Sequence, residues 1–198
     1  MLHRLRASAR PALARAVRRR AAGAHPDRGD TMIVWFTGRP AAGKTTVATA
    51  VVERLQAQGR SAQLLDGDVL RREISQDLGF SRADRDEQVR RAAMAARALA
   101  DTGVVAVVAL VSPFREARAH ARALCAPHAF LEVYVDAPLD VAEARDPKGL
   151  YRRARRGEIA EFTGIDSPYE TPESPDLRLD AAALPPASLT DEVMQRLR

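Results

Sequence analysis

The sequence predicts an α/β protein built on a doubly wound parallel sheet with helices on both faces. Three observations lead to this prediction. Short apolar segments of strand length alternate with longer helical segments, which is the pattern of right-handed βαβ units. Residues 104–112 form a continuous apolar, β-branched run that suits a parallel strand buried on both faces. A glycine-bounded loop joins the first expected strand to the first expected helix.

The expected elements follow from the periodicity of apolar residues. We expect strands over 32–38, 61–68, 104–112 and 130–136. We expect helices up to about residue 58, over 69–100 with a break near 78–81, over 116–125, and from 138 to about 143. Residues 146–175 are polar, contain glycine and proline, and are expected to form a loop. Within it, residues 162–170 have an aromatic residue at each end, which is typical of a functional lid.

Composition excludes several classes of protein. With 46% hydrophobic and 29% charged residues, the 198-residue chain has the composition of a globular domain. A single cysteine, Cys125, excludes a disulfide framework and a four-cysteine metal site. The longest apolar run has eight residues, whereas a membrane span needs ~18. We therefore expect no membrane partner.

The positive charge of the chain lies at its N-terminal end. Residues 1–31 hold eight arginines and two aspartates, which leaves 23 basic and 24 acidic residues in 32–198. We interpret 1–31 as a disordered basic extension, or as a start placed too far upstream with the true start at Met32. A transit peptide and a nucleic-acid-binding arm are the alternatives. Residues 32–198 are expected to be the folded domain, and because this part is nearly neutral we expect no nucleic-acid partner for it.

The loop at 38–45 matches G-x-x-x-x-G-K-[ST] and lies between an expected strand and an expected helix. Backbone N–H groups of such a loop and the positive end of the helix dipole converge on phosphate. Lys44 is then placed to reach the β- and γ-phosphate oxygens, and the Thr45 hydroxyl to bind Mg²⁺. The alternative is a chance match in a loop rich in Gly and Ala. The motif predicts nucleotide binding on a P-loop NTPase-type fold.

Two residues inside this loop are unusual. Pro40 lacks an N–H group and Ala41 disfavours a positive φ, at positions where a small polar residue and a glycine are common. We expect a lower affinity for nucleotide as a result.

Polar residues follow two further expected strands at the same edge of the sheet, where open α/β sheets bind ligands. Asp66 and Asp68 lie at the end of the second strand, and Asp68 is a candidate Mg²⁺ ligand or proton acceptor for a hydroxyl. Their alternative role is to cap the next helix. Ser112 follows the third strand and is a candidate phosphate contact, with helix capping as its alternative. Lys148, beside a glycine, is a candidate contact for an anionic substrate.

Several segments together resemble the adenylylsulfate (APS) kinase family over about residues 33–180. They are the phosphate loop, LDGD at 65–68, DLGFS at 77–81, DRDEQVRR at 84–91, SPFR at 112–115, EARDPKGLY at 143–151, GEIAEFTGIDSPYE at 157–170 and PESPDLRL at 172–179. The charge-dense segment 84–91 is also compatible with a solvated helix face. The family transfers the γ-phosphoryl group of ATP to the 3′-hydroxyl of APS and so forms PAPS.

The resemblance implies a complete set of site residues. The ATP site would comprise Gly38, Arg39, Pro40, Ala41, Ala42, Gly43, Lys44, Thr45 and Thr46, with Arg145 near the adenine. The APS site would comprise Asp66, Asp68, Arg71, Phe80, Arg85, Gln88, Lys148, Phe162 and Ile165, with Phe80 and Phe162 on the two faces of the adenine. Catalysis would involve Lys44, Asp68 and Ser112, and Thr45 would bind Mg²⁺. Ser112 matches a serine described in the family as a phosphoserine intermediate; because in-line transfer needs no such intermediate, we assign it a positioning role.

The chain departs from the family pattern outside the loop as well. Val69 and Gln88 stand where the family commonly has asparagine. Gln88 keeps the amide chemistry with one more methylene, whereas Val69 keeps none of it.

The leading hypothesis is a cytoplasmic, Mg²⁺-dependent APS kinase of sulfate assimilation with ATP and APS as its small-molecule substrates. The sequence is compatible with a homodimer. One alternative is a related kinase acting on another nucleotide-like or hydroxylated acceptor. The other is a weakly active nucleotide-binding protein.

Overall fold

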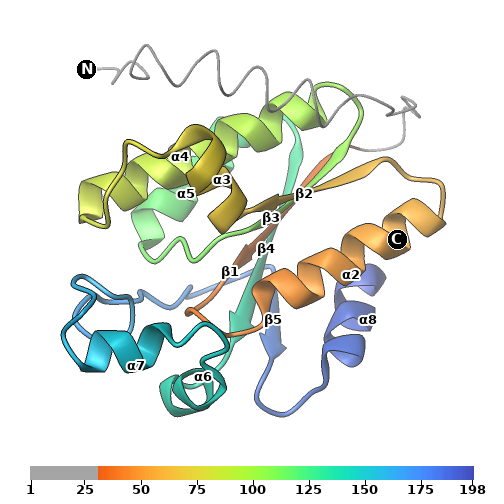
Figure 1. Ribbon diagram of the computed structural model, residues 1–198. Helices are drawn as coiled ribbons and strands as arrows, with labels where there is room; N and C mark the ends of the chain where they lie inside the picture. Colours follow the sequence, from red (N-terminus) through yellow and green to blue (C-terminus); the bar gives the residue numbers. More distant parts are fainter. Residues whose placement is uncertain (1–30) are drawn as a thin grey trace.

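The computed structural model describes residues 31–198, in which strands and helices alternate along the chain (Figure 1). The strands are β1 (Met32–Thr37), β2 (Ala62–Asp66), β3 (Val105–Ala109), β4 (Ala129–Asp136) and β5 (Leu177–Asp180). The helices are α2 (Lys44–Ala57), α3 (Gly67–Ile74), α4 (Arg82–Ala100), α5 (Arg115–Cys125), α6 (Leu139–Arg145), α7 (Leu150–Arg155) and α8 (Pro186–Arg196). Apart from Thr31, the predicted basic extension lies outside the described residues.

The five strands form one parallel sheet in the order β2-β3-β1-β4-β5. The first strand is therefore central, hydrogen-bonded to β3 on one side and to β4 on the other. Helices cover both faces, α3, α4 and α5 on one and α2 and α8 on the other (Figure 1). This arrangement confirms the predicted doubly wound α/β fold.

Alternate side chains of β1 supply the two halves of the core. Ile33 and Trp35 pack among the residues of α3, α4 and α5, whereas Val34 and Phe36 pack among those of α2 and α8. All four side chains are fully buried. Because a strand presents successive side chains to opposite faces, a continuous apolar run is what a central strand between two helical layers requires.

The break between α3 and α4 spans residues 75–81 and includes the region where the sequence predicts it. Ser81 caps α4, since its hydroxyl accepts a hydrogen bond from the Asp84 N–H group. The buried Arg91 of α4 reaches back to the carbonyl of Ile74 at 2.6 Å and to the carboxylate of Asp77 at 2.6 and 2.9 Å. These bonds hold the end of α3 against α4.

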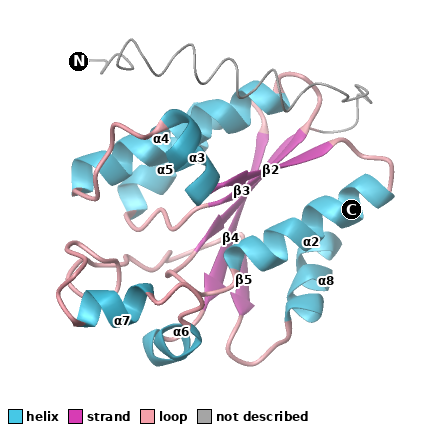
Figure 2. Ribbon diagram, viewed as in Figure 1, coloured by secondary structure: helices cyan, strands magenta, loops and turns pink. Residues whose placement is uncertain are grey.

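Two parts of the chain differ from the prediction. Residues 150–155, expected to be loop, form α7, because the Asp146 carboxylate accepts hydrogen bonds from the N–H groups of Tyr151 and Arg152 and so caps a short helix. The sequence also left β5 and α8 unassigned. Between α7 and β5 the chain is a long loop (Figure 2).

Within residues 31–198, none of the helices combines the length and the apolar character that crossing a bilayer requires.

The start of the phosphate loop is fixed by a close backbone approach. Gly38 follows β1 with φ +153°, and a Cβ at this position would lie 2.5 Å from the carbonyl oxygen of Val135 on β4. Only a residue without a side chain fits there. Gly59, at the end of α2, also has a positive φ, of +78°, but a Cβ there would meet no atom within 4 Å.

We predict that Gly38→Ala destabilises the protein far more than Gly59→Ala. The Gly59 substitution carries only the cost of a left-handed alanine, ~1–2 kcal/mol. At Gly38 the loop must also move away from β4, which adds a steric cost and disturbs nucleotide binding. Urea unfolding and ADP titration of the two variants measure both effects. Equal losses of unfolding free energy, with equal ADP affinity, would contradict the prediction.

Candidate active site

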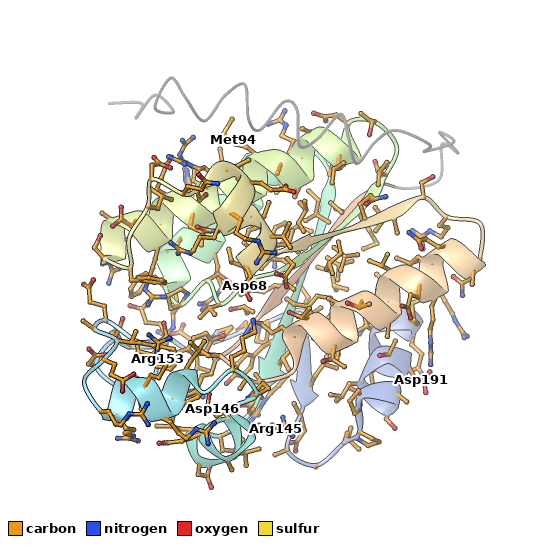
Figure 3. All side chains as sticks on the ribbon, in the orientation of Figure 1. Asp68, Met94, Arg145, Asp146, Arg153 and Asp191 are labelled. Carbon is orange, nitrogen blue, oxygen red and sulfur yellow. The ribbon has the colours of Figure 1, made fainter. Side chains whose placement is uncertain are left out.

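One large cavity lies at the carboxyl edge of the sheet, with a volume of 970 Å³. Its wall is formed by the phosphate loop, the start of α3, the start of α4, the turn after β3, the loop between α6 and α7, and the residues that precede α8. Figure 3 shows Asp68 toward the middle of the molecule, whereas Arg153 and Asp191 lie on its outer surface. A cavity of this size holds a ligand as large as a nucleotide.

Most residues singled out in the sequence line this cavity. They are Pro40, Ala41, Ala42, Gly43, Lys44, Thr45, Thr46, Asp66, Asp68, Arg71, Phe80, Arg85, Gln88, Ser112, Arg145, Lys148 and Phe162. Gly38, Arg39 and Ile165 are not part of the wall. The Arg39 guanidinium instead bonds to the Ala137 carbonyl, and Ile165 packs against the core.

The phosphate loop forms despite its two unusual residues. Ala41 adopts φ +60°, the conformation that alanine disfavours and that the sequence indicated this position would need. The hydroxyl of Tyr151 on α7 donates a hydrogen bond to the Pro40 carbonyl at 3.1 Å. The loop is thus supported from outside, by a residue of the segment that follows Lys148.

Lys44 is the first residue of α2, and its relative exposure is only 8%. Its ammonium donates to the carbonyls of Gly38 at 2.9 Å and Arg39 at 2.7 Å. Burial lowers the pKa of Lys44 to about 7, although the carboxylates of Asp66 and Asp68 act in the opposite direction. Lys44 is thus an exception to the usual exposure of lysine side chains in loops and at helix starts.

Nucleotide binding should take up a proton. At pH 8.5 an amine with a pKa of about 7 is mostly neutral, whereas phosphate oxygens beside it favour the ammonium and raise its pKa. We predict an uptake of roughly one proton per ADP bound at pH 8.5, measured by calorimetry in two buffers of different ionisation enthalpy.

Lys44→Arg is the matched control for this measurement, because a guanidinium stays charged at this pH. It should bind ADP with no proton uptake. Identical binding heats in the two buffers for the unchanged protein would contradict the prediction.

The Asp66 carboxylate at the end of β2 has two roles, since it caps α3 and also bonds to the phosphate loop. Asp66 caps α3, since its Oδ1 accepts from the N–H groups of Asp68 at 2.9 Å and Val69 at 3.3 Å. Its other oxygen accepts a hydrogen bond of 2.9 Å from the Thr45 hydroxyl. The capping alternative thus holds for Asp66, and the same carboxylate faces the phosphate loop.

A cationic and aromatic wall lies beyond Asp68. The guanidinium of Arg71 lies 4.5 Å from the centroid of the Phe80 ring, and that of Arg85 lies 5.6 Å from it. Arg71 is held by the carbonyls of Leu78 and Gly79, both at 3.0 Å. The Phe80 side chain is about half exposed, at 49%. This wall offers two positive charges and an accessible ring to an anionic, aromatic ligand.

Phe162 has a different environment from Phe80. Its ring is buried and packs edge-on against Tyr151, with centroids 5.0 Å apart. Both rings line the same cavity, but in this structure one face of Phe80 is taken by an arginine and Phe162 is packed against its neighbour. The expected adenine sandwich therefore requires these rings to change partners.

Lys148 reaches across the cavity to Asp68 and forms an ion pair with it. The loop that carries Lys148 is fixed at its base by Asp146, the cap of α7. Both members of the ion pair are more than half exposed, so the pair contributes little to stability and can be exchanged for a ligand.

Gln88 and Ser112 are buried polar residues of the cavity wall. Within the described part of the chain, the Gln88 carbonyl oxygen has no hydrogen-bond partner. The Ser112 hydroxyl accepts a hydrogen bond of 3.1 Å from the indole N–H of Trp35, and Ser112 has a strained φ of +39°. Ser112 does not cap α5: the first N–H group of that helix, of Arg115, donates to the Glu170 carboxylate at 2.8 Å.

The sequence model of the adenylylsulphate kinase family matches residues 30–180. The chain belongs to the adenylylsulphate kinase family. It is 52% identical over 165 residues to an adenylyl-sulfate kinase of Burkholderia ambifaria, covering 83% of this chain and 91% of that protein. It is 48% identical over 167 residues to one of Aeromonas hydrophila, covering 84% and 85% of the two chains.

Among solved structures, the fold matches that of the Mycobacterium tuberculosis APS kinase CysC in complex with AMPPNP and APS. The TM-score is 0.83, at 48% identity, and the match covers 85% of this chain and 98% of that one. These comparisons confirm both the resemblance found in the sequence and the P-loop type of fold.

The structure separates the departures from the adenylylsulphate kinase family pattern into two groups. Gln88, Pro40 and Ala41 line the cavity, whereas Val69 does not. Val69 contributes its N–H group to the cap formed by Asp66, which any non-proline residue can do. Val69 therefore takes part in the helix cap and not in the cavity wall.

Sequence reasoning missed one end of the cavity. Ala181, Leu184, Pro186 and Leu189, around the start of α8, line it together with Arg145. The Arg145 guanidinium donates to the Ala181 carbonyl at 2.5 Å. The signal was a short strand pattern at 177–180 followed by two prolines, which places these residues at the same carboxyl edge as the phosphate loop.

Proposed function

We propose that this protein transfers the γ-phosphoryl group of ATP to the 3′-hydroxyl of APS, giving ADP and PAPS, in the cytoplasm as a step of sulfate assimilation. The observation that carries the proposal is that a single cavity joins a phosphate loop with a buried lysine to a wall with two arginines and an accessible phenylalanine ring. Membership of the adenylylsulphate kinase family supports the same pair of substrates.

The ATP phosphates would lie in the loop formed by residues 38–46, with Lys44 against the transferred group. In the transition state this ammonium would offset the charge that develops on the phosphoryl oxygens. The adenine of ATP would lie between the guanidinium of Arg145, which is planar, and the aliphatic residues at the start of α8, which offer it apolar surface.

The residues at the edge of β2 fit a magnesium ion. The Thr45 hydroxyl and the Asp66 carboxylate, 2.9 Å apart, are hard oxygen donors, and Mg²⁺ prefers such ligands together with phosphate oxygens and water. Residues 31–198 hold no cluster of three His, Cys, Asp or Glu residues able to bind a metal, so the nucleotide would supply most of the remaining ligands. When bound, Mg²⁺ would neutralise charge on the β- and γ-phosphates.

The acceptor would occupy the other end of the cavity. Arg71, Arg85 and Lys148 would bind its phosphosulfate group, and Phe80 and Phe162 would contact its adenine. Asp68 would accept the proton of the 3′-hydroxyl as that oxygen bonds to the γ-phosphorus and the bond to the β-phosphate oxygen breaks. Ser112 would act through position alone, because its hydroxyl is buried and hydrogen-bonded to Trp35.

Release of ADP with and without APS tests the proposal. We expect ATP turnover to depend on APS and to yield one PAPS per ADP. ATP turnover that is unaffected by APS but stimulated by another hydroxylated nucleotide would favour the related kinase, and no turnover with normal ATP binding would favour a nucleotide-binding protein. Light scattering tests the homodimer.

Lys148→Met should raise the KM for APS about 10- to 100-fold, because a charge-assisted contact is worth ~1.5–3 kcal/mol. The KM for ATP should change less than about threefold, because Lys148 lies at the acceptor end. Arg153→Met is the matched control, since Arg153 is exposed on α7 and does not line the cavity. Equal effects of the two variants on the KM for APS would count against this placement of the acceptor.

A further inference from the structure

A buried arginine outside the cavity connects three elements, two of which carry active-site residues. Arg118 of α5 is 3% exposed. Its guanidinium donates to the Ser112 carbonyl at 2.8 Å, to the Glu132 carboxylate of β4 at 2.9 Å, and to the Glu170 carbonyl at 2.7 Å. The first partner belongs to the strained turn after β3, and the last to the long loop between α7 and β5.

Tyr169, the neighbour of Glu170, makes a second connection. Its buried hydroxyl lies 2.9 Å from the Thr37 hydroxyl, which itself donates to the Val111 carbonyl at 2.8 Å. The Tyr169 hydroxyl is therefore the donor. Thr37 is the last residue of β1 and directly precedes the phosphate loop. One side chain thus joins the end of the lid to the base of that loop and to the turn before Ser112.

The backbone supports the same junction. The Glu170 N–H group donates to the Pro113 carbonyl at 2.8 Å, and the Arg115 N–H group donates to the Glu170 carboxylate at 2.8 Å. Residues 169–171 are therefore attached to the turn at 111–115, whereas the acceptor-facing part of the lid is tied to α4 through Arg85, which donates to the Glu161 carbonyl.

Stability alone does not require this arginine. A buried ion pair can often be replaced by apolar residues at little cost in unfolding free energy. What a guanidinium adds is a rigid set of N–H donors that can bond to several acceptors in fixed directions. The three partners of Arg118 lie on three separate elements, which indicates a role in holding those elements in register.

We propose that Arg118 and Tyr169 are positioning residues, which fix the end of the lid to the Ser112 turn and to the base of the phosphate loop. Neither side chain contacts substrate in this arrangement; both act through the backbone of residues 37, 111–113 and 169–170. The role in catalysis rests on the proposed kinase function. The acceptor-binding side chains of the lid are then aligned with the phosphate loop only while this junction is intact.

The test compares two disruptions of the junction with a matched control. Tyr169→Phe removes one hydroxyl, and Arg118→Met combined with Glu132→Gln removes both charges of the buried ion pair. Arg122, which also lies 3.6 Å from Glu132, keeps its ion pair with Asp176 at 2.6 Å. Tyr134→Phe is the control, because Tyr134 is also buried and stacks on the Tyr169 ring at 6.0 Å. Its hydroxyl bonds to the side chains of Asp136 and Thr171, and not to Thr37, Arg118 or the turn at 111–113.

We expect Tyr169→Phe to raise the KM for APS and lower kcat, each by about fivefold, while the KM for ATP changes less than about twofold. The double variant should show larger changes in the same direction. Tyr134→Phe should leave all three constants within about twofold of the unchanged protein. Melting temperatures lowered in all three variants, with unchanged kinetic constants below those temperatures, would overturn the proposal.

Hydrogen exchange separates this inference from the proposed function. The junction predicts faster amide exchange at residues 111–114 and 163–170 together in Tyr169→Phe and in the double variant, but not in Tyr134→Phe. This result is expected whichever acceptor the enzyme uses, and its absence overturns the proposal. Failure of the proposed function would instead appear in the unchanged protein, as ADP release that does not depend on APS.

Discussion

The position of β1 at the centre of the sheet is the constraint on which the active site depends. Paired on both sides and buried on both faces, this strand has no freedom to shift, so the residue that follows it leaves the sheet at a fixed point. Gly38 passes so close to the carbonyl of Val135 that only a glycine fits. The position of Gly38 therefore determines where the phosphate loop runs, where α2 starts and where the buried lysine lies. The rest of the cavity is arranged around these residues.

Charge is distributed unevenly around this fixed centre. The ammonium of Lys44 is buried and bonded to backbone carbonyls, while its nearest carboxylates, Asp66 and Asp68, lie at the edge of the sheet. The charged form of such a buried amine is stabilised more strongly when phosphate oxygens are bound beside it than when they are not. The site is therefore built for a bound anion at the expense of its own electrostatic stability, as is usual where function and stability compete.

The sequence predicted the elements that repeat a strong local pattern. β1, β3 and β4 are apolar runs of strand length, and the phosphate loop has a motif whose chemistry is local. β5 was not predicted because it has only four residues, two of them exposed, and pairs on one side only. α7 was not predicted because its start depends on a side-chain cap from Asp146 rather than on apolar periodicity.

The residues of the site were likewise predicted only where the local sequence pattern indicates their position. Asp66, Asp68 and Lys148 could be found because polar residues at strand ends and in glycine-bearing loops meet at one edge of a parallel sheet. The residues around Leu184 were missed, because their place in the cavity depends on the pairing of β5 with β4 and the short pattern of β5 was not assigned as a strand. The role of Arg118 could not be predicted either. It lies in a helix with several arginines, and the local sequence does not distinguish a buried guanidinium from a solvated one.

The ion pair between Lys148 and Asp68 has a consequence for how the proposed enzyme would use ATP. With no acceptor present, one oxygen of the carboxylate assigned to take up a proton is bonded to the Lys148 ammonium. An arriving acceptor offers Lys148 a stronger anion, and the carboxylate is released as the hydroxyl comes to lie beside it. Because the pair is exposed and weak, this exchange costs little. The acceptor itself would thus activate the base, and the nucleotide would be protected from wasteful hydrolysis until then.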